Sequence, residues 1–174
     1  MMTILAIGIL LAVLYTGTVI WVNGELPDSI SAMVYVMERH GQWVWTVWMW
    51  AVSVCVCIPL IDALPDAWKL LGFATLCCLV LCGAMPISSA LTNKKWHDAL
   101  GIAAGVLSQL CVAVVSPWWL AAWALWPFLM GSTVIQPDGG DMRKTFKGKG
   151  VFVAEAICLL TVAGAVTEYY LTIS

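Results

Sequence analysis

The stretch that decides the fold class is residues 3–22, TILAIGILLAVLYTGTVIWV, which contains no charged side chain. A helix of about 20 apolar residues is long enough to cross the hydrocarbon core of a bilayer. The run ends beside Trp21, and tryptophan is typical of the membrane–water interface. Because no positively charged segment precedes the run, we expect a retained first membrane span rather than a cleaved signal peptide.

The composition of the whole chain agrees with this first span. Of 174 residues, 62% are hydrophobic and only 10% are charged, whereas soluble domains have about 25% charged residues. The chain also lacks a basic patch large enough to neutralise the phosphates of a nucleic acid. We therefore predict an all-α protein, a polytopic transmembrane helix bundle, with residues 1–174 forming one integral membrane domain.

Long apolar runs bounded by turns recur along the chain. Asp66 precedes one of them and is expected to cap its helix. Six spans are predicted in total, or five if the fourth and fifth runs form one broken hairpin. The expected spans are about 3–22, 42–60, 67–85, 96–115, 118–135 and 151–171.

Basic residues lie almost entirely on one side of this predicted bundle. The opposite side has Lys69 alone. An excess of Lys and Arg marks cytoplasmic loops, so we expect a multi-pass protein of a cell inner membrane with both termini outside. The loops predicted to be cytoplasmic, 24–41, 86–95 and 137–149, contain Arg39, Lys94, Lys95, Arg143, Lys144, Lys147 and Lys149.

Residues 29–40 differ from the membrane spans. Ile30, Met33, Val34 and Met37 form one apolar stripe at helical spacing. Such a helix is roughly 16–18 Å long, too short to cross the bilayer. We predict a short interfacial or re-entrant amphipathic helix that packs against the bundle.

Small residues in the fourth run predict close helix packing. Gly101 and Gly105, followed by Ser108, form a face on which another helix can approach closely. Cysteines also occur within the apolar runs, and none belongs to a Cys-x-x-Cys motif. We interpret them as polarisable packing residues. They are Cys55, Cys57, Cys77, Cys78, Cys82, Cys111 and Cys158.

Polar side chains at membrane depth are costly and are therefore functional candidates. Glu155 lies about five residues inside its span and needs a cation, a metal, a proton or water as a partner. We expect His40, His97 and Glu155 to converge on one cytoplasm-facing pocket. The candidate pocket residues are Ser31, Tyr35, Glu38, His40, His97, Asp98, Gln109 and Glu155.

Two chemistries remain open for the histidines. His40, His97 and Asp98 could bind Zn²⁺ beside an open water position, with Glu38 or Glu155 as alternatives to Asp98. The other interpretation is a hydrogen-bonded or proton-handling role without a cofactor, in which Asp98 favours the positive end of a helix dipole. The sequence assigns no catalytic residue.

Two short motifs carry a resemblance. Pro27-x-Ser29-Ile-Ser31 with Tyr35, and Lys94-x-x-His97-x-x-x-Gly101, resemble features of small bacterial and phage-encoded polytopic membrane proteins. That family implies no particular activity. The chain is more remotely similar to alkaline-ceramidase-like membrane hydrolases, whose zinc site uses serine, aspartate and three histidines among seven spans. This sequence has two histidines and six predicted spans.

These patterns favour binding or passage of a small molecule, an ion or a lipid through the pocket. One alternative is a membrane-embedded, metal-dependent lipid hydrolase. Another is a structural or regulatory subunit of a membrane complex. The expected partners are membrane lipid and either a second copy of the chain or another membrane protein, with no nucleic acid.

Overall fold

The computed structural model describes residues 1–24, 26–27, 29–30, 42–84, 91–127 and 149–173. Within these residues the chain is helical and contains no β-strand, which confirms the predicted all-α bundle. The elements in chain order are α1 (Met2–Asn23), α2 (Gln42–Ala63), η3 (Asp66–Trp68), α3 (Lys69–Ala84), α4 (Leu91–Val115), η4 (Pro117–Ala124) and α7 (Gly150–Ile173).

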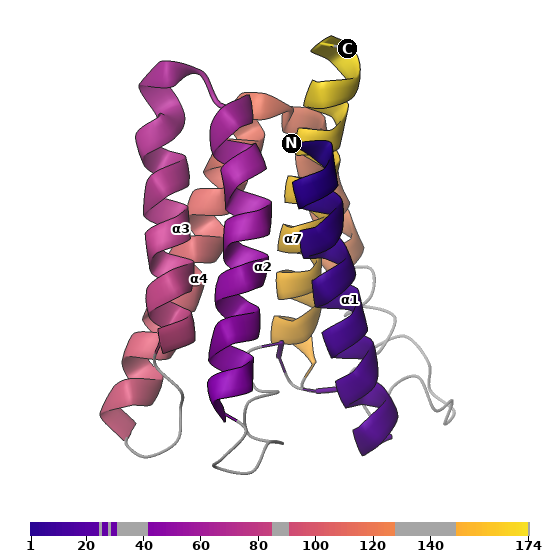
Figure 1. Ribbon diagram of the computed structural model, residues 1–174, viewed down its shortest axis with the longest axis vertical. Coiled ribbons are helices and arrows are strands. Elements are labelled where there is room, and N and C mark those ends of the chain that lie inside the picture. The colour runs from indigo at the N-terminus through magenta and orange to yellow at the C-terminus, as the bar shows by residue number, and fades with distance from the viewer. Residues whose placement is uncertain (25, 28, 31–41, 85–90, 128–148, 174) are drawn as a thin grey trace.

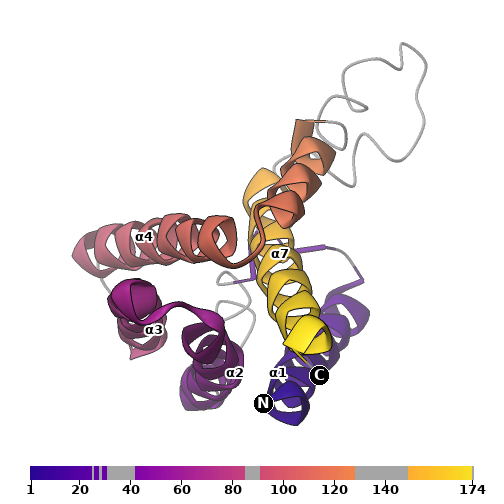
Figure 2. The same cartoon turned by 90° about the horizontal axis from the view of Figure 1, so that it is seen from above.

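The helices form two layers. α1, α2 and α3 stand side by side, with α4 and α7 behind them (Figures 1 and 2). α2 packs against α1 and α3, α3 packs against α4, and α7 contacts α4, α2 and α1. Both chain termini lie at one end of the bundle, called here the terminal end (Figure 1). The opposite end, called here the loop end, contains the last residues of α1 and α3 and the first residues of α2, α4 and α7.

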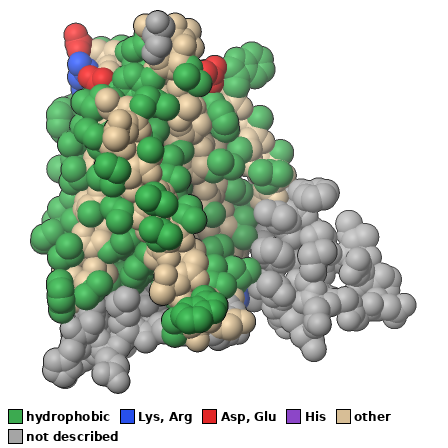
Figure 3. All heavy atoms as spheres, turned by 45° about the vertical axis from the view of Figure 1, so that its right-hand side comes forward, with side chains coloured by type: hydrophobic (Ala, Val, Ile, Leu, Met, Phe, Trp, Pro, Cys, Tyr) green, Lys and Arg blue, Asp and Glu red, His purple; other side chains and the backbone are tan. Residues whose placement is uncertain are grey.

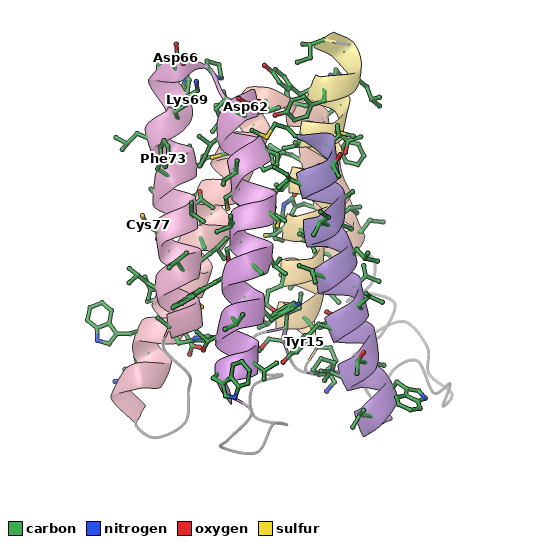
Figure 4. The ribbon with its side chains drawn as sticks, in the orientation of Figure 1. Tyr15, Asp62, Asp66, Lys69, Phe73 and Cys77 are labelled. Carbon is green, nitrogen blue, oxygen red and sulfur yellow. The ribbon has the colours of Figure 1, made fainter. Side chains whose placement is uncertain are left out.

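The described chain has five helices that are long and apolar enough to cross a membrane. Large apolar side chains cover much of the described surface between the two ends on the face shown in Figure 3. Phe73 and Cys77 project outward from α3 (Figure 4). Such a surface suits contact with lipid. The five candidate spans are Met2–Val22, Trp43–Ala63, Asp66–Ala84, Lys95–Val115 and Gly150–Ile173.

The predicted fifth run, 118–135, is described only in part. Pro117–Ala124 forms a 3₁₀ helix of eight residues, although 3₁₀ runs longer than three or four residues are uncommon. Proline is well suited to the first turn of a helix, so Pro117 explains where this element begins. Residues 128–148 lie outside the described residues, as do residues 31–41 of the predicted amphipathic helix.

The predicted span 96–115 agrees with the candidate span Lys95–Val115, but two predictions about the starts of helices were wrong. α4 begins at Leu91, so residues 91–95 are helical rather than part of the expected loop 86–95; Lys94 and Lys95 are good helix formers, and the next glycine is Gly101. Asp66 does not cap its helix, because Pro65 occupies the N-cap position. The carboxylate of Asp66 instead forms an ion pair with Lys69 at 2.7 Å.

Of the two predicted glycines, Gly105 lies at ordinary contact distance from α7, since a Cβ atom there would lie 3.8 Å from Cys158 Sγ, and the tighter approaches occur at other glycines. A Cβ atom on Gly72 would lie 2.6 Å from Ile61 Cγ1, whereas one on Gly101 would meet nothing within 4 Å. Gly101 is exposed, so the helix approach expected there is absent within the described chain. The buried face of α4 includes Ala104 and Ser108, and Gly101 lies beyond its edge.

A cluster of buried side chains joins α1, α2 with the residue that follows it, α4 and α7. All seven cysteines are free thiols, and Cys111 belongs to this cluster. Its position among aliphatic side chains agrees with a packing role. The buried members are Leu5, Val56, Leu60, Leu64, Cys111, Val112, Val162, Ala165 and Val166.

Candidate functional site

Half of the predicted pocket residues belong to the described part of the chain. His97, Asp98, Gln109 and Glu155 can be placed. The expected approach of His40 to His97, and with it the predicted zinc pair, lies outside the described residues. Within the described ranges, no group of three or more His, Cys, Asp and Glu side chains could hold a metal ion. The remaining candidates, Ser31, Tyr35, Glu38 and His40, also lie outside the described residues.

Glu155 lies near the loop end, five residues after the first residue of α7. Its Oε2 atom accepts a hydrogen bond from the backbone N–H of Ile30. Residues 29–30 follow α1 and are not helical, so Ile30 is not part of an intrahelical ladder. A hydrogen bond to a carboxylate is stronger than one between neutral groups. This contact therefore fixes the segment after α1 to the start of α7.

His97 is almost completely buried, with 2% of its surface exposed. Its Nδ1 atom lies 3.3 Å from the carbonyl oxygen of Cys82 and 3.4 Å from Cys82 Sγ. A carbonyl oxygen can only accept, so this geometry favours a proton on Nδ1 and leaves Nε2 as the acceptor of a neutral ring. Asp98, the next residue, is exposed and lies two turns into α4 rather than at its start.

Trp45 of α2 lies beside His97. Its ring centroid lies 5.9 Å from that of His97, and the side chain is fully buried. The indole Nε1 has no hydrogen-bond partner among the described residues. Leaving a buried donor unsatisfied costs about 1–3 kcal/mol. We therefore expect a water molecule or a polar ligand beside it.

Glu155 lies at the same end of the bundle as Cys82 and His97, five residues after the first residue of α7. Cys82 contacts His97 directly. α2, α3, α4 and α7 thus bring four side chains to the same part of the loop end: Trp45, Cys82, His97 and Glu155. These four residues are called the loop-end cluster below. The sequence indicated His97 and Glu155 but gave no reason to single out Trp45 or Cys82.

Gln109 forms a second polar site, six residues before the last residue of α4. Its Oε1 atom accepts hydrogen bonds from Trp123 Nε1 at 2.8 Å and from Thr161 Oγ1 at 3.0 Å. Its Nε2 atom donates to Ser108 Oγ at 3.3 Å. Gln109 therefore links α4 to η4 and α7. Buried indole N–H groups usually find an acceptor, and this was the one sequence signal for the role of Trp123.

A third site lies at the terminal end. Ser116 Oγ and Trp119 Nε1 each donate to Glu168 Oε2 at 2.8 Å. These contacts hold the turn between α4 and η4 against α7. Figure 4 shows Asp62, Asp66 and Lys69 at the same end. Glu168 was not predicted as a site residue, because a carboxylate near a helix end can be solvated.

Comparison of the chain with protein-family models, curated proteins and solved structures gives no match. Fold and site together define a class: a helical bundle with the dimensions of a membrane domain and a polar cluster at one end. Proposals about its function therefore depend on the geometry and chemistry of the three sites.

Proposed function

We propose that the chain is a multi-pass membrane protein that binds a small hydrated cation at the loop-end cluster. The observation that carries the proposal is that the loop end of the bundle contains the Glu155 carboxylate, the buried ring of His97 and the indole N–H of Trp45, which no described residue satisfies. An ionised carboxylate at that depth is costly unless positive charge or water accompanies it. A cation beside Glu155 would add positive charge to the hydrogen bond that the carboxylate already accepts from Ile30.

The rest of the cluster suits a cation that keeps part of its hydration shell. In a neutral His97 with its proton on Nδ1, the Nε2 atom is an acceptor, and Cys82 Sγ lies 3.8 Å from it. The N–H of Trp45 is a donor that a bound water would satisfy. The non-helical backbone at Ile30 beside Glu155 is also typical of ion sites in membrane proteins, where irregular backbone is confined to buried or water-lined positions.

Melting temperatures test cation binding directly. Detergent-solubilised protein would be heated with the chlorides of Na⁺, K⁺, Mg²⁺ or Zn²⁺ at constant ionic strength. A cation that binds the folded protein stabilises it in proportion to the logarithm of its concentration. We expect such a shift for one of them in the wild type and its loss in Glu155→Gln.

The matched control is Asp66→Asn, which removes an exposed carboxylate at the terminal end and should leave the cation-dependent shift unchanged. The proposal is wrong if no cation shifts the melting temperature of the wild type. It is also wrong if Glu155→Gln keeps the full shift.

We propose further that the loop end faces the cytoplasm of a cell with an inner membrane, so that the cation enters from that side. The support is the excess of basic residues in the loops at this end. In a cysteine-free background, Thr172→Cys should react with an impermeant maleimide on intact cells. Lys147→Cys should react only after permeabilisation, and the reverse pattern would overturn this orientation.

A further inference from the structure

A groove on α7 at the terminal end is independent of the loop-end cluster. It has a volume of about 490 Å³, within the range of about 300–1,000 Å³ found for small-molecule sites. Polar atoms come from Thr167, Thr172 and Glu168. The walls toward the middle of α7 are apolar, formed by residues that include Leu160, Ala163 and Gly164.

Trp119 forms the side of the groove opposite α7. A Cβ atom on Gly164 would overlap the indole ring, so the ring lies directly on the backbone of α7. The indole N–H donates to Glu168 Oε2, which fixes the ring in place. An indole held in this way presents its π system beside a carboxylate, and both attract a cationic group.

The two oxygens of the Glu168 carboxylate differ in the hydrogen bonds that they accept from described residues. Ser116 and Trp119 both donate to Oε2, whereas no described residue donates to Oε1. The carboxylate is exposed, so a ligand can reach it from the surface. A primary ammonium group could donate to Oε1 and to the hydroxyl oxygen of Thr167, which also lines the groove.

We propose that this groove binds a phospholipid with a primary ammonium headgroup, of the phosphatidylethanolamine type. The ammonium lies at Glu168 beside Trp119, and the start of an acyl chain lies along Leu160 and Ala163. Exposed apolar side chains surround the groove, including Leu160 and Leu171, so lipid has direct access to it. The polar end of the groove lies about 20 Å along α7 from Glu155, in the opposite leaflet.

Native mass spectrometry of the detergent-solubilised full chain tests the proposal. The probes are dioleoyl-phosphatidylethanolamine, dioleoyl-phosphatidylglycerol and soluble phosphoethanolamine. We expect the wild type to bind the ethanolamine lipid about tenfold more tightly than the glycerol lipid, the scale of one charge-assisted hydrogen bond. Glu168→Gln should remove this preference while its amide oxygen still accepts from Ser116 and Trp119, which keeps the fold intact.

Asp66→Asn is the control for charge at the same end and should retain the preference. Equal binding of the two lipids by the wild type would overturn the proposal, as would an undiminished preference in Glu168→Gln. If soluble phosphoethanolamine binds as tightly as the lipid, the groove is a site for small amines and the lipid assignment is wrong.

Discussion

The contact between α2 and α3 differs from the contact that joins α4, η4 and α7 in how far it depends on hydrogen bonds between side chains. Between α2 and α3 the backbones approach closely at small residues: Gly72 lies against Ile61, and Gly83 against Met49. Between α4, η4 and α7 the described side chains hydrogen-bond to each other, at Gln109 and at Glu168. Each contact also contains a feature of the other. The α2–α3 contact contains a hydrogen bond, from Trp50 Nε1 to the carbonyl oxygen of Val80 at 2.9 Å. The contact that joins α4, η4 and α7 contains a close approach, of Trp119 to Gly164. The difference is that this second contact pairs side-chain donors with side-chain acceptors.

Close packing and hydrogen bonds are both needed, because lipid removes the usual hydrophobic driving force for association between helices. Association then comes from van der Waals packing and from hydrogen bonds across the interface. A packed contact tolerates any side chain that fits, whereas a polar contact requires particular partners. Two of the three polar sites belong to the α4–η4–α7 contact, and the loop-end cluster also uses α4 and α7. The polar half of the bundle is therefore where we place ligand binding.

The largest expected effect comes from breaking the packed contact. In Gly72→Val a Cβ atom would lie 2.6 Å from Ile61 Cγ1 and 3.1 Å from Leu64 Cδ1, so these side chains or the two helices must shift. Overpacking of this kind costs about 1–3 kcal/mol. Unfolding of the purified protein by SDS, followed by circular dichroism, measures the loss.

Gly101→Val is the matched control, because a Cβ atom there meets nothing within 4 Å. Its free energy of unfolding should change by only a few tenths of a kcal/mol, the difference in helix propensity between the two residues. An equal loss in both variants would mean that the close approach at Gly72 does not govern the α2–α3 contact.

A smaller effect is expected from Gln109→Leu, which breaks the polar contact. The substitution removes the acceptor of Trp123 and Thr161 while keeping a side chain of similar size. Hydrogen bonds between membrane helices contribute about 0.6 kcal/mol on average, so the loss of two should cost about 1 kcal/mol. The same SDS titration checks this value.

A double-mutant cycle separates the hydrogen bond from packing. Thr161→Val keeps the shape of the side chain and removes the donor. If the hydroxyl acts through Gln109, the combined variant should lose less than the sum of the two single losses. Strict additivity would show that Thr161 is held by the carbonyl oxygen of Cys158, its other acceptor at 2.9 Å, rather than by Gln109.

The helices were predictable because each span is a continuous apolar run. Four of the predicted spans, at 3–22, 42–60, 67–85 and 151–171, match their helices to within about three residues at each end. The start of α4 was not predicted, because the polar residues 92–95 look like a loop although their backbone is helical. The length of η4 also has no signal in the sequence beyond Pro117.

The hydrogen-bond partners of the polar side chains were harder to predict than the places of those side chains in the sequence. Gln109 and Glu155 could be singled out, since a polar side chain within an apolar run needs a partner. Their partners could not, because Trp123, Thr161 and the N–H of Ile30 meet them only after the helices have been arranged in space. Composition does not determine that arrangement. Trp45 illustrates the same limit, because the sequence gave no reason to single it out and the fold buries it completely.

The smallest effect is expected where α7 bonds to α2 at the terminal end. The hydroxyl of Tyr170 donates to the carboxylate of Asp62, which is exposed. Tyr170→Phe removes the donor but keeps the ring that packs beside the core, and water can then solvate Asp62. We expect a loss of about 0.5 kcal/mol or less in the SDS titration, with Tyr169→Phe as the control. A loss as large as that of Gln109→Leu would contradict the comparison, because an exposed bond would then contribute as much as a part-buried one.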